Sequence, residues 1–159
     1  MFSFFKKKPK HENEAVSQMA LLFTLDEEDP TFCSELLNKD DFDFSIDSLK
    51  KLDAYLAQVC EREPEGNDLL RIILRAGAYA GEVFRRNSTD TYYWLNYEDA
   101  TKHVESIKKW GDSIGTCFVL WSAPESVAFP LGKVAKFMEN GEEDSLHGFV
   151  TALLTKNDL

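Results

Sequence analysis

The sequence predicts a single α+β domain that is mostly helical, with a small antiparallel sheet and a buried central helix. Two observations support this class: apolar residues recur every three or four positions in several stretches, and two short stretches are rich in aromatic and β-branched residues. The chain has 159 residues, of which 43% are hydrophobic. A chain of this length buries enough surface to fold without a disulfide or metal. We expect residues 12–159 to form the domain and residues 1–11 to be a flexible basic and aromatic tail.

Two helices and an irregular segment are expected before the central helix. Apolar residues from Ala15 to Phe23 have near-helical spacing, and a second helix is expected from about residue 46 to 62, with Ser45 as its N-cap. Between them, residues 26–47 contain nine acidic residues and one lysine. Aromatic residues interrupt these acids, which argues against disorder. We therefore expect a packed irregular segment, with one helical turn near residues 33–37.

The central helix is expected to follow a cap at Asn67 or Asp68 and to run toward Arg86, with residues 69–84 as its buried stretch. Apolar and small residues occupy nearly every face of this stretch, which is typical of a buried helix. Gly77 and Gly81 lie inside it, and a glycine in a helix costs about 1 kcal/mol relative to alanine. We expect close packing against this glycine face to compensate for that cost.

The second half of the chain is expected to contain the sheet and two further helices. Strands are predicted at residues 92–95 and 116–121, with a helical connection between them. Pro130 suits the first turn of a helix that ends near Asn140, and residues 146–154 carry the apolar stripe of the last helix. The acidic residues 142–144 are expected at the positive N-terminus of that helix.

The charge of the chain favours some partners and disfavours others. Lysine and arginine number 18 against 28 aspartates and glutamates, which gives a formal net charge of −10. A molecule of this charge repels a nucleic-acid backbone, so nucleic acid is not an expected partner. A basic protein partner is expected instead, and Asp40, Asp41 and Asp43 in the acidic segment are its candidate interaction surface.

Glu82 is the most informative charged residue, because a carboxylate in a buried helix must be paired, hydrogen-bonded or protonated. Arg85 and Arg86 follow it at helical spacing, which favours a structural ion pair. The alternative is a general acid or base with a raised pKa in a pocket. The candidate pocket residues are Tyr79, Glu82, Arg85, Trp94, Lys136 and Asn140. Lys133, Lys136 and Asn140 share one helix face, which indicates either an anion site or a solvated surface.

Other motifs that indicate chemistry are missing from the sequence. Cys33, Cys60 and Cys117 are far apart and have apolar neighbours, as expected of buried thiols in a reducing cytosol. No histidine spacing indicates a metal site, and no glycine-rich nucleotide fingerprint occurs. We therefore expect no metal, no cofactor and no catalytic residue, and a cytoplasmic protein.

The first ten residues combine aromatic and basic side chains in an order that does not match a secretory signal. One interpretation is weak contact with an anionic membrane surface; the other is a solvated tail. The residues that would make the membrane contact are Phe2, Phe4, Phe5, Lys6, Lys7 and Lys8.

Two blocks of the sequence carry a family resemblance. Residues 77–83 read GAYAGEV, Trp94 follows, and residues 129–145 fit the pattern FPxxxVxKxxxNGxxDS. Together these blocks resemble a group of small bacterial proteins of uncharacterised function, over about residues 45 to 155. The resemblance implies a bacterial, cytosolic domain and no particular activity. Ala80 and Phe137 depart from the family pattern. In charge and size the chain is also similar to immunity proteins of toxin systems.

Two hypotheses of function follow. The first is a non-enzymatic, acidic protein-interaction module, with an immunity-like role as one form of it. The alternative is a small enzyme or ligand-binding domain with a pocket around Glu82, Arg85, Trp94 and Lys136. The two differ in whether Glu82 and Lys136 converge in a concave site.

Overall fold

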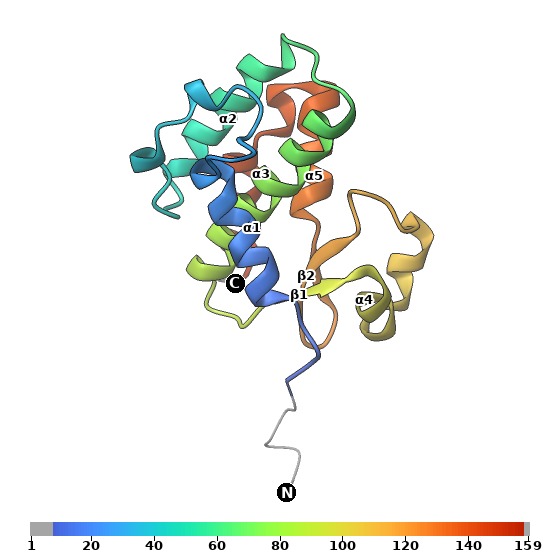
Figure 1. Cartoon of the computed structure of the whole chain (residues 1–159). Helices are drawn as coiled ribbons and strands as arrows, with labels where there is room; N and C mark the ends of the chain where they lie inside the picture. Colours follow the sequence, from blue (N-terminus) through green and yellow to red (C-terminus); the bar gives the residue numbers. More distant parts are fainter. Residues whose placement is uncertain (1–7, 158–159) are drawn as a thin grey trace, which may run out of the picture.

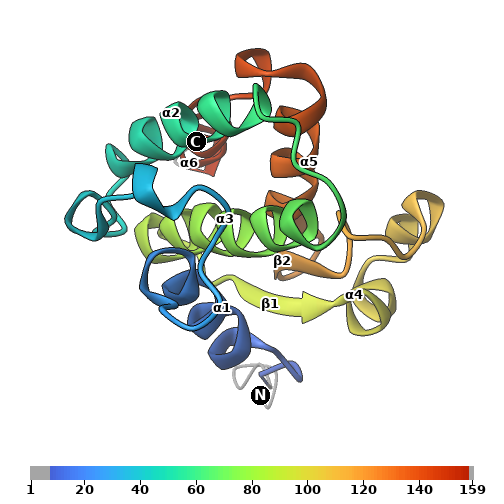
Figure 2. The same cartoon turned by 45° about the horizontal axis from the view of Figure 1, so that its top comes forward.

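The longest helix, α3 (Gly66–Asn87), crosses the middle of the molecule and is surrounded by the other elements (Figure 1). Helix α1 (Asn13–Leu25) and helix α5 (Pro130–Asn140) make the most extensive contacts with it. Figure 2 shows α1 and strand β1 on one side of α3, with α2 (Ser48–Cys60) and α6 (Leu146–Asn157) on the other. The predicted α+β class and buried central helix are confirmed.

The computed structural model describes residues 8–157. Its remaining elements are strands β1 (Tyr93–Asn96), β2 (Phe118–Ser122) and β3 (Ser126–Ala128), helix α4 (Tyr97–His103), and the short 3-10 helices η2 (Ser34–Leu36), η3 (Lys39–Asp41), η4 (Glu105–Trp110) and η5 (Glu142–Asp144).

The sheet is antiparallel in the order β1-β2-β3, and each of its faces covers a separate apolar core. Trp94 pairs with Leu120, which pairs with Ala128, and all three face the main core around α3. The alternate residues Leu95 and Val119 face a smaller core against α4 and η4. Side chains alternate across a strand, so one short sheet can separate two cores.

Strand β3 and the break at Val104 differ from expectation. Strand β3 has only three residues, too few to show an alternating pattern in the sequence. The predicted helical connection divides into α4 and η4 because Val104 adopts an extended conformation.

The starts of α2 and α3, and the source of the negative charge at the start of α6, differ in detail from expectation. Helix α2 begins at Ser48, and Asp47 occupies the N-cap position predicted for Ser45. Helix α3 begins at Gly66, so Asn67 and Asp68 lie inside the helix and do not cap it. Gly66 has a φ of +60°, a conformation that glycine adopts without strain. The acids 142–144 form η5, and the carboxylate at the start of α6 comes from Asp53 of α2. Asp53 accepts hydrogen bonds from the backbone N–H of Leu146 (2.8 Å) and His147 (3.3 Å).

The glycine face of α3 packs as closely as predicted. A Cβ atom built on Gly77 would lie 2.8 Å from the Cα of Leu131 on α5. On Gly81 it would lie 2.2 Å from the indole of Trp94. Neither position has room for a methyl group, so the glycines allow α5 and the sheet to approach the α3 backbone.

All three cysteines are free thiols, but they are half-buried, not fully buried as expected. Each lies at the margin of the main core, packed against it from a loop or a helix end. Burial raises the pKa of the Cys60 and Cys117 thiols, which keeps both protonated at neutral pH.

The N-terminal side of the domain is attached to the sheet. The backbone N–H of Glu12 donates to the carbonyl of Trp94 (2.8 Å), and the ring of His11 packs beside Tyr93. Of the residues expected to contact a membrane, Lys8 is exposed, and those from Phe2 to Lys7 lie outside the described residues. Within residues 8–157, no helix combines the length and apolar character needed to cross a bilayer.

Candidate functional site

The six candidate pocket residues do not gather in one place. Glu82, Arg85 and Trp94 meet at the C-terminal half of α3, where α1 and β1 pack against it. Neither described pocket is lined by these three side chains, whereas Lys136 lines a pocket between η4, the sheet, α5 and α6. The predicted pocket around Glu82 and Lys136 is therefore divided into a closed cluster and a separate open pocket.

In the closed cluster, the Glu82 carboxylate is fully buried and receives hydrogen bonds from three elements. Arg85 donates to both oxygens, from Nε at 2.6 Å and from Nη2 at 3.0 Å. Arg86 adds two longer hydrogen bonds, from Nε at 3.3 Å and from Nη2 at 3.2 Å. Ser17 Oγ of α1 and Trp94 Nε1 of β1 also donate, at 2.5 Å and 3.0 Å. The predicted arginine partners are confirmed.

These contacts determine the ionisation of Glu82. Burial by itself raises the pKa of a carboxyl, but the hydrogen bonds from Arg85, Ser17 and Trp94 outweigh it and lower the pKa of Glu82 to about 2. Glu82 is therefore ionised at neutral pH and already saturated with donors. A general base needs an oxygen that can reach a substrate proton, which this closed arrangement does not offer.

Tyr79 lies one turn before Glu82 on α3 and does not contact the Glu82 carboxylate, but contacts the acidic segment. Its hydroxyl contacts Ser48 Oγ (2.7 Å) and accepts from the backbone N–H of Phe44 (3.0 Å). Its ring packs against Phe42 and Phe44, both from the acidic segment. Tyr79 therefore anchors the acidic segment to the central helix.

The predicted anion face of α5 is occupied largely by the protein's own carboxylate. Lys133 Nζ lies 2.7 Å from Asp144, and Asn140 donates to the other oxygen of Asp144 at 2.9 Å. These hydrogen bonds lower the pKa of the Asp144 carboxyl. Lys136, one turn along, is exposed, and within residues 8–157 it has neither a hydrogen bond nor an ion pair.

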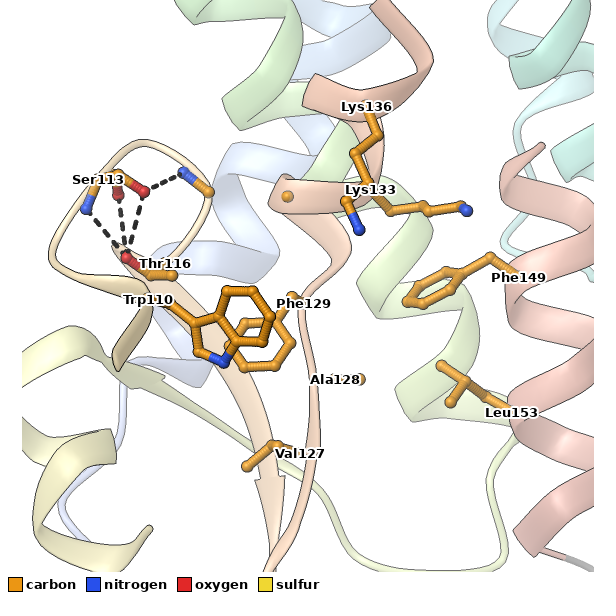
Figure 3. A pocket seen from close by; sticks show the side chains of 12 residues that line it. Trp110, Ser113, Thr116, Val127, Ala128, Phe129, Lys133, Lys136, Phe149 and Leu153 are labelled. Atoms are coloured by element: carbon orange, nitrogen blue, oxygen red, sulfur yellow. Dashed lines mark hydrogen bonds between the residues drawn. The ribbon is translucent and has the colours of Figure 1, made fainter. Parts of the chain in front are cut away.

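Lys136 belongs to a pocket of about 340 Å³ whose walls are mainly apolar. Figure 3 shows Lys133 and Lys136 at one end, Trp110 and Phe129 along one side, and Phe149 on the opposite side. A second hollow of about 420 Å³ adjoins it along α6 and shares three of its lining residues, Lys133, Phe149 and Leu153. The full lining of the first is Trp110, Ser113, Gly115, Thr116, Val127, Ala128, Phe129, Gly132, Lys133, Lys136, Phe149 and Leu153.

Sequence reasoning missed most of this pocket, because its walls come from segments far apart in the chain. Trp110 was the one available signal, since a tryptophan between Lys109 and Gly111 belongs to no apolar stripe. In the structure its side chain is 62% exposed and lies beside Phe129, with ring centroids 6.5 Å apart.

The acidic segment is packed and irregular, as predicted, and is attached to α3 at its start. Arg75 Nη2 donates to Asp26 (2.7 Å), and its Nη1 donates to the carbonyl of Asp29 (2.9 Å). The hydroxyl of Tyr55 donates to the carbonyl of Phe32. These contacts fix the backbone that leads into the predicted turn, which forms as η2.

The candidate interaction residues lie on η3 and directly after it. Asp40 and Asp43 are exposed, and Asp41 is half-buried. Asp43 accepts from the backbone N–H of Ser45 (3.0 Å), and hydrogen bonds from Ser45 lower the pKa of this carboxyl. Phe42 between them is buried in the main core. The side chains of this stretch therefore alternate between charge at the surface and aromatic anchors inside.

The described residues offer no group of three histidine, cysteine or acidic side chains arranged for a metal. Comparison of the chain with protein-family models, curated proteins and solved structures finds no match. The function is therefore inferred from the side chains themselves.

Proposed function

We propose that the protein is a non-enzymatic interaction module whose acidic segment, residues 26–47, binds a basic protein surface. The observation that carries this proposal is the display of Asp40 and Asp43 in solvent beside the buried ring of Phe42. Immunity proteins of toxin systems, to which the chain is similar in charge and size, are one class with this kind of role.

The attachment of the segment to α3 favours binding, because a surface that is already ordered loses little conformational entropy on association. Arg75 holds its start, and Tyr79 and Arg86 hold its C-terminal part: the Tyr79 hydroxyl accepts from the backbone N–H of Phe44, and the Arg86 guanidinium lies over the ring of Phe44, 3.7 Å from its centroid. All three anchoring residues belong to the buried central helix.

The charge of this surface favours fast and selective association. Complementary charge raises the rate of encounter and rejects like-charged partners more than it adds affinity. Residues 26–47 contain nine acidic residues and a single lysine, Lys39. A basic partner would therefore be steered to this side of the molecule.

The alternative, an enzyme or ligand site at Glu82, Arg85, Trp94 and Lys136, has less support. Glu82 is saturated by its own neighbours, and Lys136 lines a separate pocket. No reaction is proposed for these residues.

The experiment is capture of a partner by the wild-type chain, followed by association kinetics with that partner. The test variant replaces Asp40, Asp41 and Asp43 with asparagine. We expect its association rate to fall several-fold at low salt. Because salt shortens the Debye length to about 8 Å or less, the wild-type rate should fall toward that of the variant as salt rises.

The matched control replaces Glu98, Glu125 and Glu139 with glutamine, which removes the same charge from exposed positions outside the segment. It should associate faster than the aspartate variant. Equal rates for the two variants, or a wild-type rate that ignores salt, would contradict the proposal.

A further inference from the structure

The pocket that contains Lys136 is lined by two lysines in an otherwise acidic protein. Lys133 forms a direct ion pair with Asp144 (2.7 Å), whereas the exposed ammonium of Lys136, at the same end of the pocket, interacts with this carboxylate only at longer range. The lining of the adjoining hollow contains Lys133 and Lys156 and one acidic residue, Glu143. No acidic residue lines the first pocket.

The remainder of the pocket is apolar and partly formed by aromatic rings. Trp110 and Phe129 make one wall, and Phe149 and Leu153 of α6 make the other (Figure 3). A tryptophan that is 62% exposed leaves a large apolar surface in water, and covering it is favourable by the hydrophobic effect. The polar residues Ser113 and Thr116 are hydrogen-bonded to each other and to their own loop.

The size of the pocket suits a small molecule. Ligand sites are typically clefts of about 300–1,000 Å³ with apolar walls and a few polar groups that fix orientation. The observed volume of about 340 Å³ lies at the lower end of this range. The charged group at one end then decides which small molecules fit.

We propose that this pocket binds a small amphipathic anion, namely a carboxylate with an apolar body. The carboxylate lies at the Lys136 end, and the apolar body lies between Trp110 and Phe149. Charge complementarity selects the anion over a neutral or cationic molecule with the same body. This site is independent of the acidic segment and of any protein partner bound there.

The test compares three ligands that share one apolar chain: octanoate, octanol and octylamine. Binding is followed by the amide chemical shifts of the folded chain in NMR, with Gly132 and Phe149 as reporters of the pocket. We expect octanoate to shift these amides and to bind about three- to fivefold more tightly than octanol, which is the range of one exposed charge contact. Octylamine should bind least.

Lys136→Gln tests the charged end without disturbing the core, because Lys136 is exposed. We expect this variant to lose about three- to fivefold in affinity for octanoate and nothing for octanol. The control is Lys51→Gln, an exposed lysine of α2 that lines neither described pocket, which should bind octanoate like the wild type.

Phe149→Ala tests the apolar wall and should weaken octanoate and octanol alike. The proposal is overturned if octanoate leaves the pocket amides unchanged, if octylamine binds as well as octanoate, or if Lys136→Gln and Lys51→Gln bind octanoate equally.

Discussion

The cluster around Glu82 and the pocket around Lys136 each contain a charged side chain, but the two side chains differ in burial and in the number of their partners. At Glu82, six donor atoms from Arg85, Arg86, Ser17 and Trp94 converge on a carboxylate that is fully buried. At Lys136, an ammonium group stands at the edge of an apolar pocket, and within residues 8–157 it forms no hydrogen bond or ion pair and interacts with Asp144 only through longer-range electrostatics.

The difference shows that the partners of a charged group, more than its type, determine what it can do. A buried charge with all its partners present contributes to folding, and removing one partner is costly. A charge at a pocket rim has lost little hydration and contributes little to stability, so it is free to meet a ligand. The two regions should therefore respond very differently to substitution.

The largest expected effect is at Gly81, which supports the closed cluster. Gly81→Leu should destabilise the protein by at least ~3 kcal/mol, because even a Cβ atom would overlap the indole of Trp94 that donates to Glu82. Urea denaturation measures this free energy. Gly81→Ala should already lower the midpoint. The control is Gly148→Ala, because a Cβ atom added there would lie no closer than 3.6 Å to any neighbour. We expect this control to leave the unfolding free energy unchanged or to raise it. A Gly81→Leu midpoint equal to that of the wild type would mean that this face is open.

Glu82→Gln should destabilise the protein by roughly 1 to 3 kcal/mol at neutral pH, because Arg85 and Arg86 would keep their charge without a counter-ion. The exposed Glu98→Gln is the control and should change the unfolding free energy by less than about 0.5 kcal/mol. Similar losses for the two variants would remove the argument from burial.

The pH dependence of the Glu82 contribution has a defined sign. The pKa of Glu82 falls from its ordinary value of 4.5 to about 2 on folding, so its contribution is complete above pH 4.5 and is lost as the pH falls toward 2. The wild type should therefore be more stable than Glu82→Gln at neutral pH, and their unfolding free energies should converge in acid. Denaturation curves at several pH values measure the difference. A gap that stays constant down to pH 2 would argue against the low pKa.

The smallest effect is expected at the open pocket. Lys136→Gln should change the free energy of unfolding by less than about 0.5 kcal/mol, because the side chain is exposed and has no ion pair to lose. Thermal or urea denaturation tests this directly. A loss comparable to that of Glu82→Gln would mean that Lys136 has a structural role, and the contrast between the two regions would disappear.

Local patterns in the sequence were sufficient for the order of the longer helices and of strands β1 and β2, and for the central helix, but not for the short strand β3. The stretch from Ile72 to Phe84 is apolar or small on almost every face, and a helix of this kind buries its apolar surface only inside a core. The spacing of Gly77 and Gly81 predicted close packing, and the spacing of Glu82, Arg85 and Arg86 predicted the ion pairs. These features depend on neighbours within about one helical turn, which the sequence determines by itself.

The tertiary structure decided which distant residues meet. Asp53 contacts the start of α6 from α2, Ser17 reaches Glu82 from α1, and Asp144 occupies the lysine face of α5. The pocket between Trp110 and Phe149 also depends on how η4, β3, α5 and α6 are placed. Helical and strand periodicity specify which face of an element is buried, but not which other element covers it. That choice is made by the packing of whole elements in three dimensions, so it is the fold that leaves Glu82 enclosed and Lys136 open.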